Sequence, residues 1–427
     1  MTNPSTMPQD DMLEHSLRAQ SLLLPSAASR RPLTEFFTRA LSAFQSSSDS
    51  AQKFQIICTV PPLSKNSSHA SASASAAVHA QAQGNPYQYP QSPAPIPPTK
   101  QPHTLIVLDS SFNPPTLAHL RMATSAVEDI IKRKGKRDVD GLRLLLLLAV
   151  VNADKAPKPA AFDERMAMMW AFARDVQQAL RGECPEVLAS GPGPRPRIDN
   201  GQGQDQDQAP GYKQGHEGGL DISVDIALTA KPFFHEKSRA MAESEFYNPP
   251  ALRGQEEGEK KEEDTTEQVI LAGYDTLIRI FNPKYYGPPP PPPTSATTQV
   301  IRHVHDPSQK GTPIQQALDP FFSRAKLRVT MRTDDEWGGK TEQMAYLESL
   351  LRDEGLEKIG GSKGWKDRIE MVEGIRKEGE EVVSSTYARE AAERGEWGVL
   401  GRLVSPGVGK WIEGERLYIC EDGGCEG

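Results

Sequence analysis

The segment between residues 104 and 132 constrains the fold more than any other part of the chain. It opens with an apolar run at 104–108, which is typical of a buried strand. Two adjacent prolines then break the chain, and the helical spacing of apolar residues begins near Thr116 and continues towards Lys132. This order predicts a strand, a tight loop and a helix, as in an α/β fold.

The start of the predicted helix is a candidate phosphate site. A helix start offers unpaired N–H groups and a partial positive charge, both of which favour an anion. His119 lies in the first predicted turn and adds a side-chain donor. A single histidine at a helix start can equally be structural, so the surrounding loop has to be considered with it.

Strands and helices alternate along the rest of the chain. We predict an α/β, Rossmann-like fold, in which a mostly parallel sheet carries helices on both faces and long disordered inserts interrupt the elements. Ligands are then expected at the carboxyl ends of the strands. The predicted strands are 54–60, 104–108, 144–151, 222–230, 269–272, 327–331 and 369–372, and the predicted helices are 32–44, 116–132, 162–180, 275–281 and 385–396.

Composition divides the chain further. Tracts rich in Ser, Ala, Gly, Pro, Gln or charged residues predict disorder or linkers, because they contain few residues that can form a core. The proline run at 288–293 is either a polyproline II spacer or a ligand for a protein partner. The predicted parts are a disordered N-terminus at 1–31, an α/β element packed on the core at 32–61, a low-complexity linker at 62–101, a main domain at 102–420 with inserts at 189–220, 244–266 and 288–300, and a tail at 421–427.

Charge and cysteine content exclude several classes of protein. The formal net charge is -8 and the pI is near 5.7, which argues against general binding of nucleic acid or of an anionic membrane. The four cysteines lack metal-finger spacing and no secretory signal precedes them, so we expect free thiols in a reducing compartment. A location in the cytoplasm, the nucleus or both fits this composition. The basic run at 132–137 is either a nuclear signal or a solvated helix end.

The string Ser111-Phe112-Asn113-Pro114-Pro115-Thr116-Leu117-Ala118-His119-Leu120-Arg121-Met122 resembles the SFNPxTxxHLRM motif of nicotinamide mononucleotide (NMN) adenylyltransferases. These enzymes belong to the nucleotidyltransferase superfamily with the HxGH-type phosphate motif. The resemblance implies that residues 102–420 form a nucleotidyltransferase domain, and that Ser111, Phe112, Thr116 and His119 bind ATP. Ser110 stands where the family usually has glycine. The surrounding pattern is similar to a divergent fungal branch.

A second string, at 382–390, resembles the family's ISSTxxR motif. Hydroxyl residues before a helix are natural caps, which would be a sufficient structural reason for them. The resemblance further implies that Ser385, Thr386 and Arg389 hold the ATP phosphates.

A third string, at 270–277, resembles the family's GxD element, and the resemblance implies that Gly273 and Asp275 bind ATP. A turn glycine and a capping aspartate would be the structural alternative. Farther along, residues 282–286 resemble the family's PxxW segment, whose Trp stacks on the nicotinamide ring. Tyr286 occupies that place, and its aromatic face can stack on a cationic pyridinium.

Two weaker similarities complete the set. Asn152, Lys155 and Lys158 correspond to a loop that binds the substrate and neutralises its phosphates, although the lysines can also be plain surface charges. Glu164 precedes Arg165 where the family has His-Arg. The stretch 231–238 resembles a segment that shapes the site, in which the two phenylalanines can equally belong to the core.

The resemblance implies transfer of AMP from ATP to NMN, or to nicotinate mononucleotide, giving NAD and pyrophosphate. It implies His119 and Arg389 as the catalytic residues, ATP and NMN as binding partners, and Mg²⁺ bridging the phosphates with few protein ligands. Two alternatives remain open at this point. One is another superfamily reaction, with a different nucleotide acceptor or ATP hydrolysis, and the other is an inactive nucleotide-binding scaffold. The sequence does not determine the oligomeric state.

Overall fold

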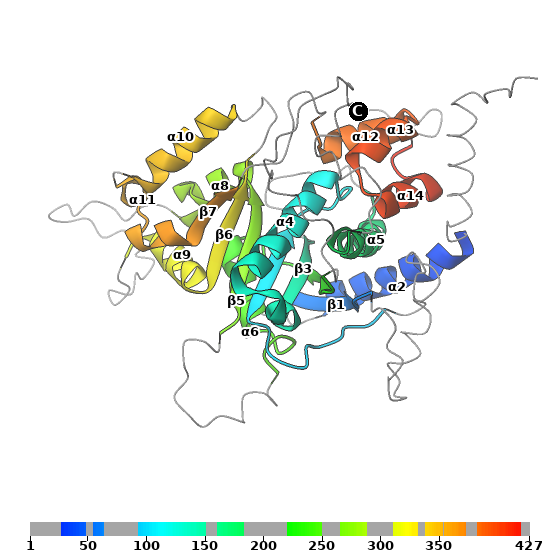
Figure 1. Cartoon of the computed structure of the whole chain (residues 1–427), viewed down its shortest axis with the longest axis horizontal. Coiled ribbons are helices and arrows are strands. Elements are labelled where there is room, and N and C mark those ends of the chain that lie inside the picture. The colour runs from blue at the N-terminus through cyan, green and yellow to red at the C-terminus, as the bar shows by residue number, and fades with distance from the viewer. Residues whose placement is uncertain are drawn as a thin grey trace, which may run out of the picture.

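The structure is a computed structural model that describes residues 27–47, 54–63, 93–150, 160–182, 220–249, 265–287, 311–331, 338–352, 354–372 and 382–419. These residues form a seven-stranded sheet between two layers of helices (Figure 1). The strands are β1 (Phe54–Val60), β2 (Thr104–Asp109), β3 (Leu142–Ala149), β4 (Ser223–Thr229), β5 (Glu267–Gly273), β6 (Ala325–Thr330) and β7 (Ile369–Val372).

The strand order determines where a ligand can bind. The order across the sheet is β1-β4-β3-β2-β5-β6-β7, and every pair is parallel except β1 with β4. The six parallel strands therefore follow the doubly-wound order of a Rossmann fold, in which the chain reverses direction between β2 and β5. A crevice forms at such a reversal, outside the carboxyl ends of the two strands. The predicted fold class is confirmed.

Each layer of helices packs on one face of the sheet. Strand β3 shows the reason, since its unbroken leucine run alternates between the two faces and is buried on both. The first layer contains α2 (Ala27–Ser46), α4 (Leu117–Lys134), α5 (Phe162–Leu180), α12 (Ser385–Glu393), α13 (Trp397–Leu403) and α14 (Pro406–Gly414). The second contains α6 (Phe234–Glu243), α8 (Tyr274–Ile280), α9 (Pro313–Arg324), α10 (Lys340–Leu351) and α11 (Gly355–Lys358). Three 3-10 helices, η3 (Lys136–Gly141), η6 (Pro283–Tyr286) and η8 (Lys363–Arg368), connect these elements.

Two predicted boundaries at the N-terminal side are wrong. Helix α2 begins at Ala27, so the last residues of the expected disordered segment 1–31 are helical. Residues 93–101, expected to belong to a linker, include a stretch held against β1. The N–H of Thr59 donates to the carbonyl of Ala94, and the N–H of Ile96 donates to Thr59 Oγ1. Backbone pairing with an edge strand, which composition does not reveal, orders this stretch.

The main domain also departs from the predictions. Strand β3 lies two residues earlier than expected, and α12 ends at Glu393 because Gly395, with a φ of 68°, closes the turn that follows it. The acidic insert was predicted to begin at 244, yet Tyr247 is fully buried and its hydroxyl donates to Asp225 at 3.0 Å. Helices α6, α9, α10, α11, α13 and α14 were not predicted.

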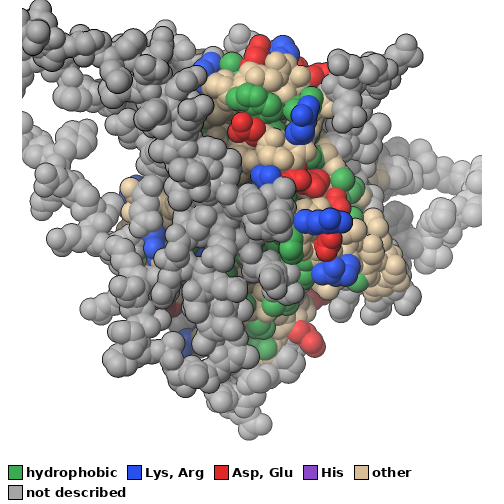
Figure 2. Space-filling model, turned by 90° about the vertical axis from the view of Figure 1, so that its right-hand side faces the viewer, with side chains coloured by type: hydrophobic (Ala, Val, Ile, Leu, Met, Phe, Trp, Pro, Cys, Tyr) green, Lys and Arg blue, Asp and Glu red, His purple; other side chains and the backbone are tan. Residues whose placement is uncertain are grey.

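Several predicted features lie outside the described residues. They include residues 1–26, the inserts at 189–219, 250–264 and 288–300 with the proline run, the tail at 421–427, and three of the four cysteines. The fourth, Cys58, is buried and not disulfide-bonded. None of the helices in the described part of the chain has the length and apolar character needed to cross a membrane. On the face in Figure 2, acidic and basic side chains of the described residues lie interspersed.

Candidate active site

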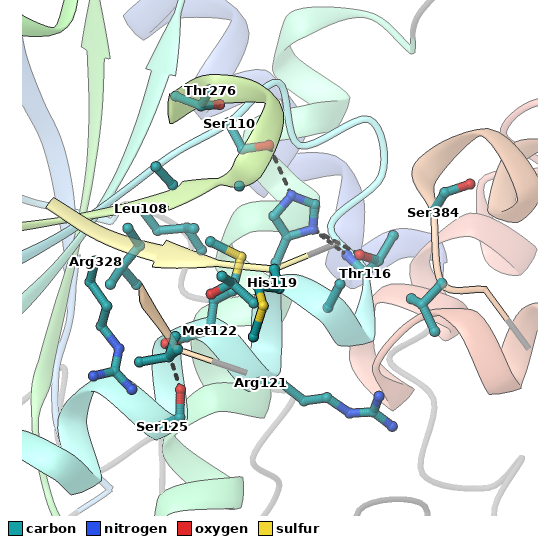
Figure 3. Close-up of a pocket in the computed structure, with 18 of the residues that line it drawn as sticks. Leu108, Ser110, Thr116, His119, Arg121, Met122, Ser125, Thr276, Arg328 and Ser384 are labelled. Atoms are coloured by element: carbon teal, nitrogen blue, oxygen red, sulfur yellow. Dashed lines mark hydrogen bonds between the residues drawn. The ribbon is translucent and has the colours of Figure 1, made fainter. Parts of the chain in front are cut away.

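A cavity of about 600 Å³ opens at the carboxyl ends of β2 and β5, at the reversal point of the sheet. It lies between the first turns of α4 and α12, two helices that are far apart in the sequence (Figures 1 and 3). Its lining includes most of the residues that the sequence singled out, namely Ser111, Thr116, His119, Gly273, Asp275, Ser385, Thr386 and Arg389.

His119 is held in one orientation by its own helix turn. Thr116, the N-cap of α4, donates its backbone N–H to His119 Nδ1 at 3.0 Å, and its hydroxyl lies 2.9 Å from the same nitrogen. The other ring nitrogen, Nε2, lies 2.9 Å from Ser110 Oγ on the cavity side (Figure 3). Because a backbone N–H can only donate, Nδ1 is unprotonated and the neutral ring carries its proton on Nε2. Burial lowers the pKa of His119 from 6.5 to about 4, so the ring is neutral at pH 7.

The side chain of Phe112 packs in the core behind the loop and does not line the cavity. It has a φ of 46° and is fully buried, and its ring lies 6.0 Å from that of His119 and 6.4 Å from that of Phe172. The following Asn113-Pro114 peptide bond is cis. Among the ATP-binding residues implied by the resemblance, Phe112 is therefore the one whose side chain does not line the cavity. Its ring anchors the turn to the core.

The backbone carbonyls of this loop accept hydrogen bonds from side chains of α12 and α5. Arg389 Nη1 donates to the carbonyl of Asn113 at 2.8 Å, and Ser385 Oγ donates to that of Pro114 at 2.9 Å. Arg165, which is almost fully buried, donates to the carbonyl of Ser111 at 3.3 Å. Two helices that are distant in sequence, α5 and α12, thus hold the loop in place.

The side-chain oxygen of Asn113 accepts two hydrogen bonds. Its Oδ1 accepts from the N–H of Ala160 at 3.1 Å and from the hydroxyl of Tyr418 at 2.8 Å. Burial raises the pKa of Tyr418, so this hydroxyl stays protonated and can only act here as a donor. Tyr418 was not predicted, and no local pattern identifies it, because its contact spans 305 positions.

The first turn of α12 presents hydroxyls and a cation to the cavity. Ser384 is its N-cap and accepts the N–H of Tyr387 at 3.1 Å. Thr386 Oγ1 accepts from Arg389 Nη2 at 3.2 Å. The guanidinium is therefore fixed between the loop after β2 and its own helix start. Such a fork of N–H groups is suited to binding a phosphate.

Gly273 and Asp275 lie at the carboxyl end of β5. A Cβ on Gly273 would approach Asp275 Oδ1 to 2.7 Å, so a larger residue would displace the carboxylate. Their place in the lining fits the predicted position beside the nucleotide.

Tyr286 and Glu164, which the sequence also singled out, do not line this cavity. The hydroxyl of Tyr286 donates to the carbonyl of Ile280 at 2.6 Å, and its ring lies 5.8 Å from that of His235. Glu164 accepts from Trp411 Nε1 at 2.8 Å, so it joins α5 to α14. Asn152, Lys155 and Lys158 lie outside the described residues.

The cavity is also lined by charged residues that the sequence did not single out. Asp109 at the end of β2 pairs with buried Lys237 of α6 at 2.5 Å, and Arg328 of β6 pairs with Asp129 of α4 at 2.6 Å. Within the described ranges, no group of three or more His, Cys, Asp and Glu is arranged to hold a metal ion. The charged lining is thus mostly paired within the protein.

No protein-family model matches the chain. Over 288 residues it is 28% identical to a Schizosaccharomyces pombe protein named as a candidate nicotinamide mononucleotide adenylyltransferase, covering 67% of this chain and 75% of that protein. Two structures of Plasmodium falciparum nicotinic acid mononucleotide adenylyltransferase, complexed with APC and with NaAD, align with TM-scores of 0.33 and 0.32 and with 8% and 10% identity. Each alignment covers 74% of this chain and 97% of the other. By sequence, the chain is a distant homologue of the nicotinamide mononucleotide adenylyltransferases.

Proposed function

We propose that this protein is an adenylyltransferase that transfers AMP from ATP to NMN or nicotinate mononucleotide. One observation carries the proposal. The loop with Asn113 and the helix with Arg389, 276 positions apart, meet at one cavity. The cavity lies at the reversal point of a Rossmann-type sheet, where nucleotides bind in such folds. The distant homology to NMN adenylyltransferases supports the same reaction.

The proposed reaction requires no general base. A phosphate oxygen of the mononucleotide attacks the α-phosphorus of ATP. The bond from that phosphorus to the bridging oxygen of the β-phosphate breaks, and pyrophosphate leaves with the bonding electrons. Catalysis then consists of positioning and of stabilising charge on the phosphates.

We propose the following roles for the residues of the cavity. The N–H groups at the start of α4, together with the donor side of His119, stabilise charge on the α-phosphate. Arg389, with Ser385 and Thr386, holds the departing β- and γ-phosphates. Gly273 and Asp275 lie beside the nucleoside. The second substrate would be bound by Asn152, Lys155 and Lys158. Tyr286 could stack on the nicotinamide ring only if that ring binds outside this cavity.

Mg²⁺ is part of the proposal as a companion of ATP. It prefers oxygen ligands and commonly binds through substrate phosphates, keeping several waters. The lining is compatible with that mode, because Asp275 offers a carboxylate to the cavity and no group of three or more potential ligands in the described residues would hold the ion alone. When bound, the ion would neutralise charge on the triphosphate.

The test is an assay for dinucleotide formation from ATP and Mg²⁺ with either mononucleotide. His119→Ala should lower kcat by about 10²–10³-fold, the usual cost of removing one positioned donor. His103→Ala is the matched control, because His103 precedes β2 at the end of the strand opposite the cavity. Circular dichroism would establish that both variants are folded.

The products distinguish the alternatives. Dinucleotide and pyrophosphate support the proposal. ADP and phosphate in the absence of an acceptor would indicate ATP hydrolysis, and ATP binding without any product would indicate a scaffold. A folded His119→Ala protein with unchanged turnover would contradict the assignment of this residue.

A further inference from the structure

Ser110 lines the cavity, yet the proposed reaction gives it no role. It follows β2 directly, and its backbone N–H donates to the carbonyl of Leu147 in β3 at 3.3 Å. That N–H is therefore engaged by the sheet. The hydroxyl, in contrast, lines the cavity and lies 2.9 Å from His119 Nε2.

The direction of this hydrogen bond follows from the other side of the imidazole. The Thr116 N–H occupies Nδ1, so the proton of the neutral ring is on Nε2. Nε2 therefore donates, and Ser110 Oγ accepts. The hydroxyl keeps its own proton, and among the described residues no second partner for Oγ is recorded.

This direction excludes one familiar use of a serine beside a histidine. A histidine activates a serine as a nucleophile by taking its proton, which requires an unprotonated Nε2. Here Nε2 carries the proton and the ring is fixed with Nδ1 as acceptor. In this arrangement His119 donates to Ser110, and the Ser110 O–H is available to donate to a ligand in the cavity.

We propose that Ser110 contacts the α-phosphate of the nucleotide and extends the donor of His119 by one hydroxyl. His119 Nε2–H donates to Ser110 Oγ, and the Ser110 O–H donates to a phosphate oxygen. A hydroxyl that accepts one hydrogen bond is polarised and becomes a better donor, and bonds from hydroxyls to anionic oxygens are short and strong. This inference rests on the proposed function, in which a phosphate occupies this end of the cavity.

A purely steric role for Ser110 predicts a different effect on activity. If Ser110 merely occupied the space in front of His119, its removal would free the imidazole and raise activity. If it transmits the hydrogen bond, removal leaves a gap of one hydroxyl between Nε2–H and the phosphate, and activity falls.

The experiment compares Ser110→Ala and Ser110→Gly with Ser110→Thr, which retains the hydroxyl. Ser323→Ala is the control, because Ser323 is exposed on α9 and its hydroxyl donates to the carbonyl of Pro320. We expect kcat to fall by about tenfold or more in the Ala and Gly variants and to be largely retained with Thr. In a Ser110→Ala background, His119→Ala should have little additional effect on kcat, because His119 acts through the Ser110 hydroxyl.

Binding measurements separate this inference from the proposed reaction. Calorimetry with AMP, with an unreactive ATP analogue and with adenosine needs no turnover. Ser110→Ala should weaken AMP and the analogue by a similar factor and leave adenosine unchanged. This pattern in a protein that forms no dinucleotide would support the role of Ser110 and overturn the proposed reaction. Unchanged AMP affinity, or raised kcat in the Ala or Gly variant, would overturn the role of Ser110.

Discussion

Acid is expected to destabilise this protein through His119, at a pH where most carboxylates are still charged. The pKa of the folded-state imidazole is about 4, below its ordinary 6.5, because burial disfavours the charged ring. Between these two values the unfolded chain binds a proton that the folded chain does not. Stability therefore falls as the pH drops through this window. His119 contributes fully above pH 6.5 and loses its contribution as the pH approaches 4.

The magnitude follows from the two pKa values. The full difference between 6.5 and about 4 corresponds to about 3 kcal/mol, at about 1.4 kcal/mol per pKa unit. At pH 5 the unfolded imidazole is mostly charged and the folded one mostly neutral, so about 2 kcal/mol of this is already lost. Protonation of Nδ1 would also displace the N–H of Thr116, which now donates to it.

The assay is urea unfolding of the wild type and of His119→Gln at pH 7 and pH 5. Glutamine cannot titrate, so the variant should lose about 2 kcal/mol less than the wild type between these values. NMR titration of the histidine Cε1–H signals, with the variant identifying the His119 signal, measures the pKa directly. Equal losses in both proteins, together with a His119 pKa near 6.5, would refute the account of a buried, neutral ring.

Three other outcomes follow from contacts of the site and from the packing of α5 against α14. Arg389→Lys retains one positive charge but loses the fork that joins the loop to α12, so kcat/KM for ATP should fall by about tenfold or more in steady-state assays; an unchanged value would show that charge alone suffices. Tyr418→Phe removes the hydroxyl that donates to Asn113, and chemical denaturation should show a loss of about 1 kcal/mol, with no loss if a water replaces it. Asp175 is fully buried and accepts from two groups at the start of α14, so Asp175→Ala should cost about 2–3 kcal/mol; a loss near zero would show that the cap is dispensable.

The sequence predicted the parts of the fold whose cause is local. The leucine run of β3 can only be a strand buried on both faces, and the apolar spacing of 162–180 matches α5 residue for residue. The first turns of α4 and α12 were also predictable, because hydroxyl caps precede both. Periodicity and capping are properties of short windows, so a single sequence reveals them.

Features determined by distant contacts were not predictable in this way. Residues 93–98 lie beside β1 because they pair with it, although their composition is that of a linker. The resemblance placed Phe112 with the nucleotide, whereas its ring fills the core behind His119. Family motifs identify which residues occur together, but they do not separate a residue that touches the ligand from one that supports the loop.

In the proposed reaction, the way Arg389 is bound bears on how the cavity would receive ATP. Its Nη1 and Nη2 already donate to Asn113 and Thr386, yet a guanidinium carries five N–H donors. The remaining donors can meet a phosphate without breaking either contact. His119 is likewise fixed by Thr116 before any ligand arrives. Donors held in place in advance need little reorganisation when charge develops, and this is the condition under which electrostatic stabilisation is most effective. In the proposed reaction, the contact of Tyr418 with Asn113 would therefore serve catalysis as well as stability, since it ties the last described turn of the chain to the loop beside His119 and Arg389.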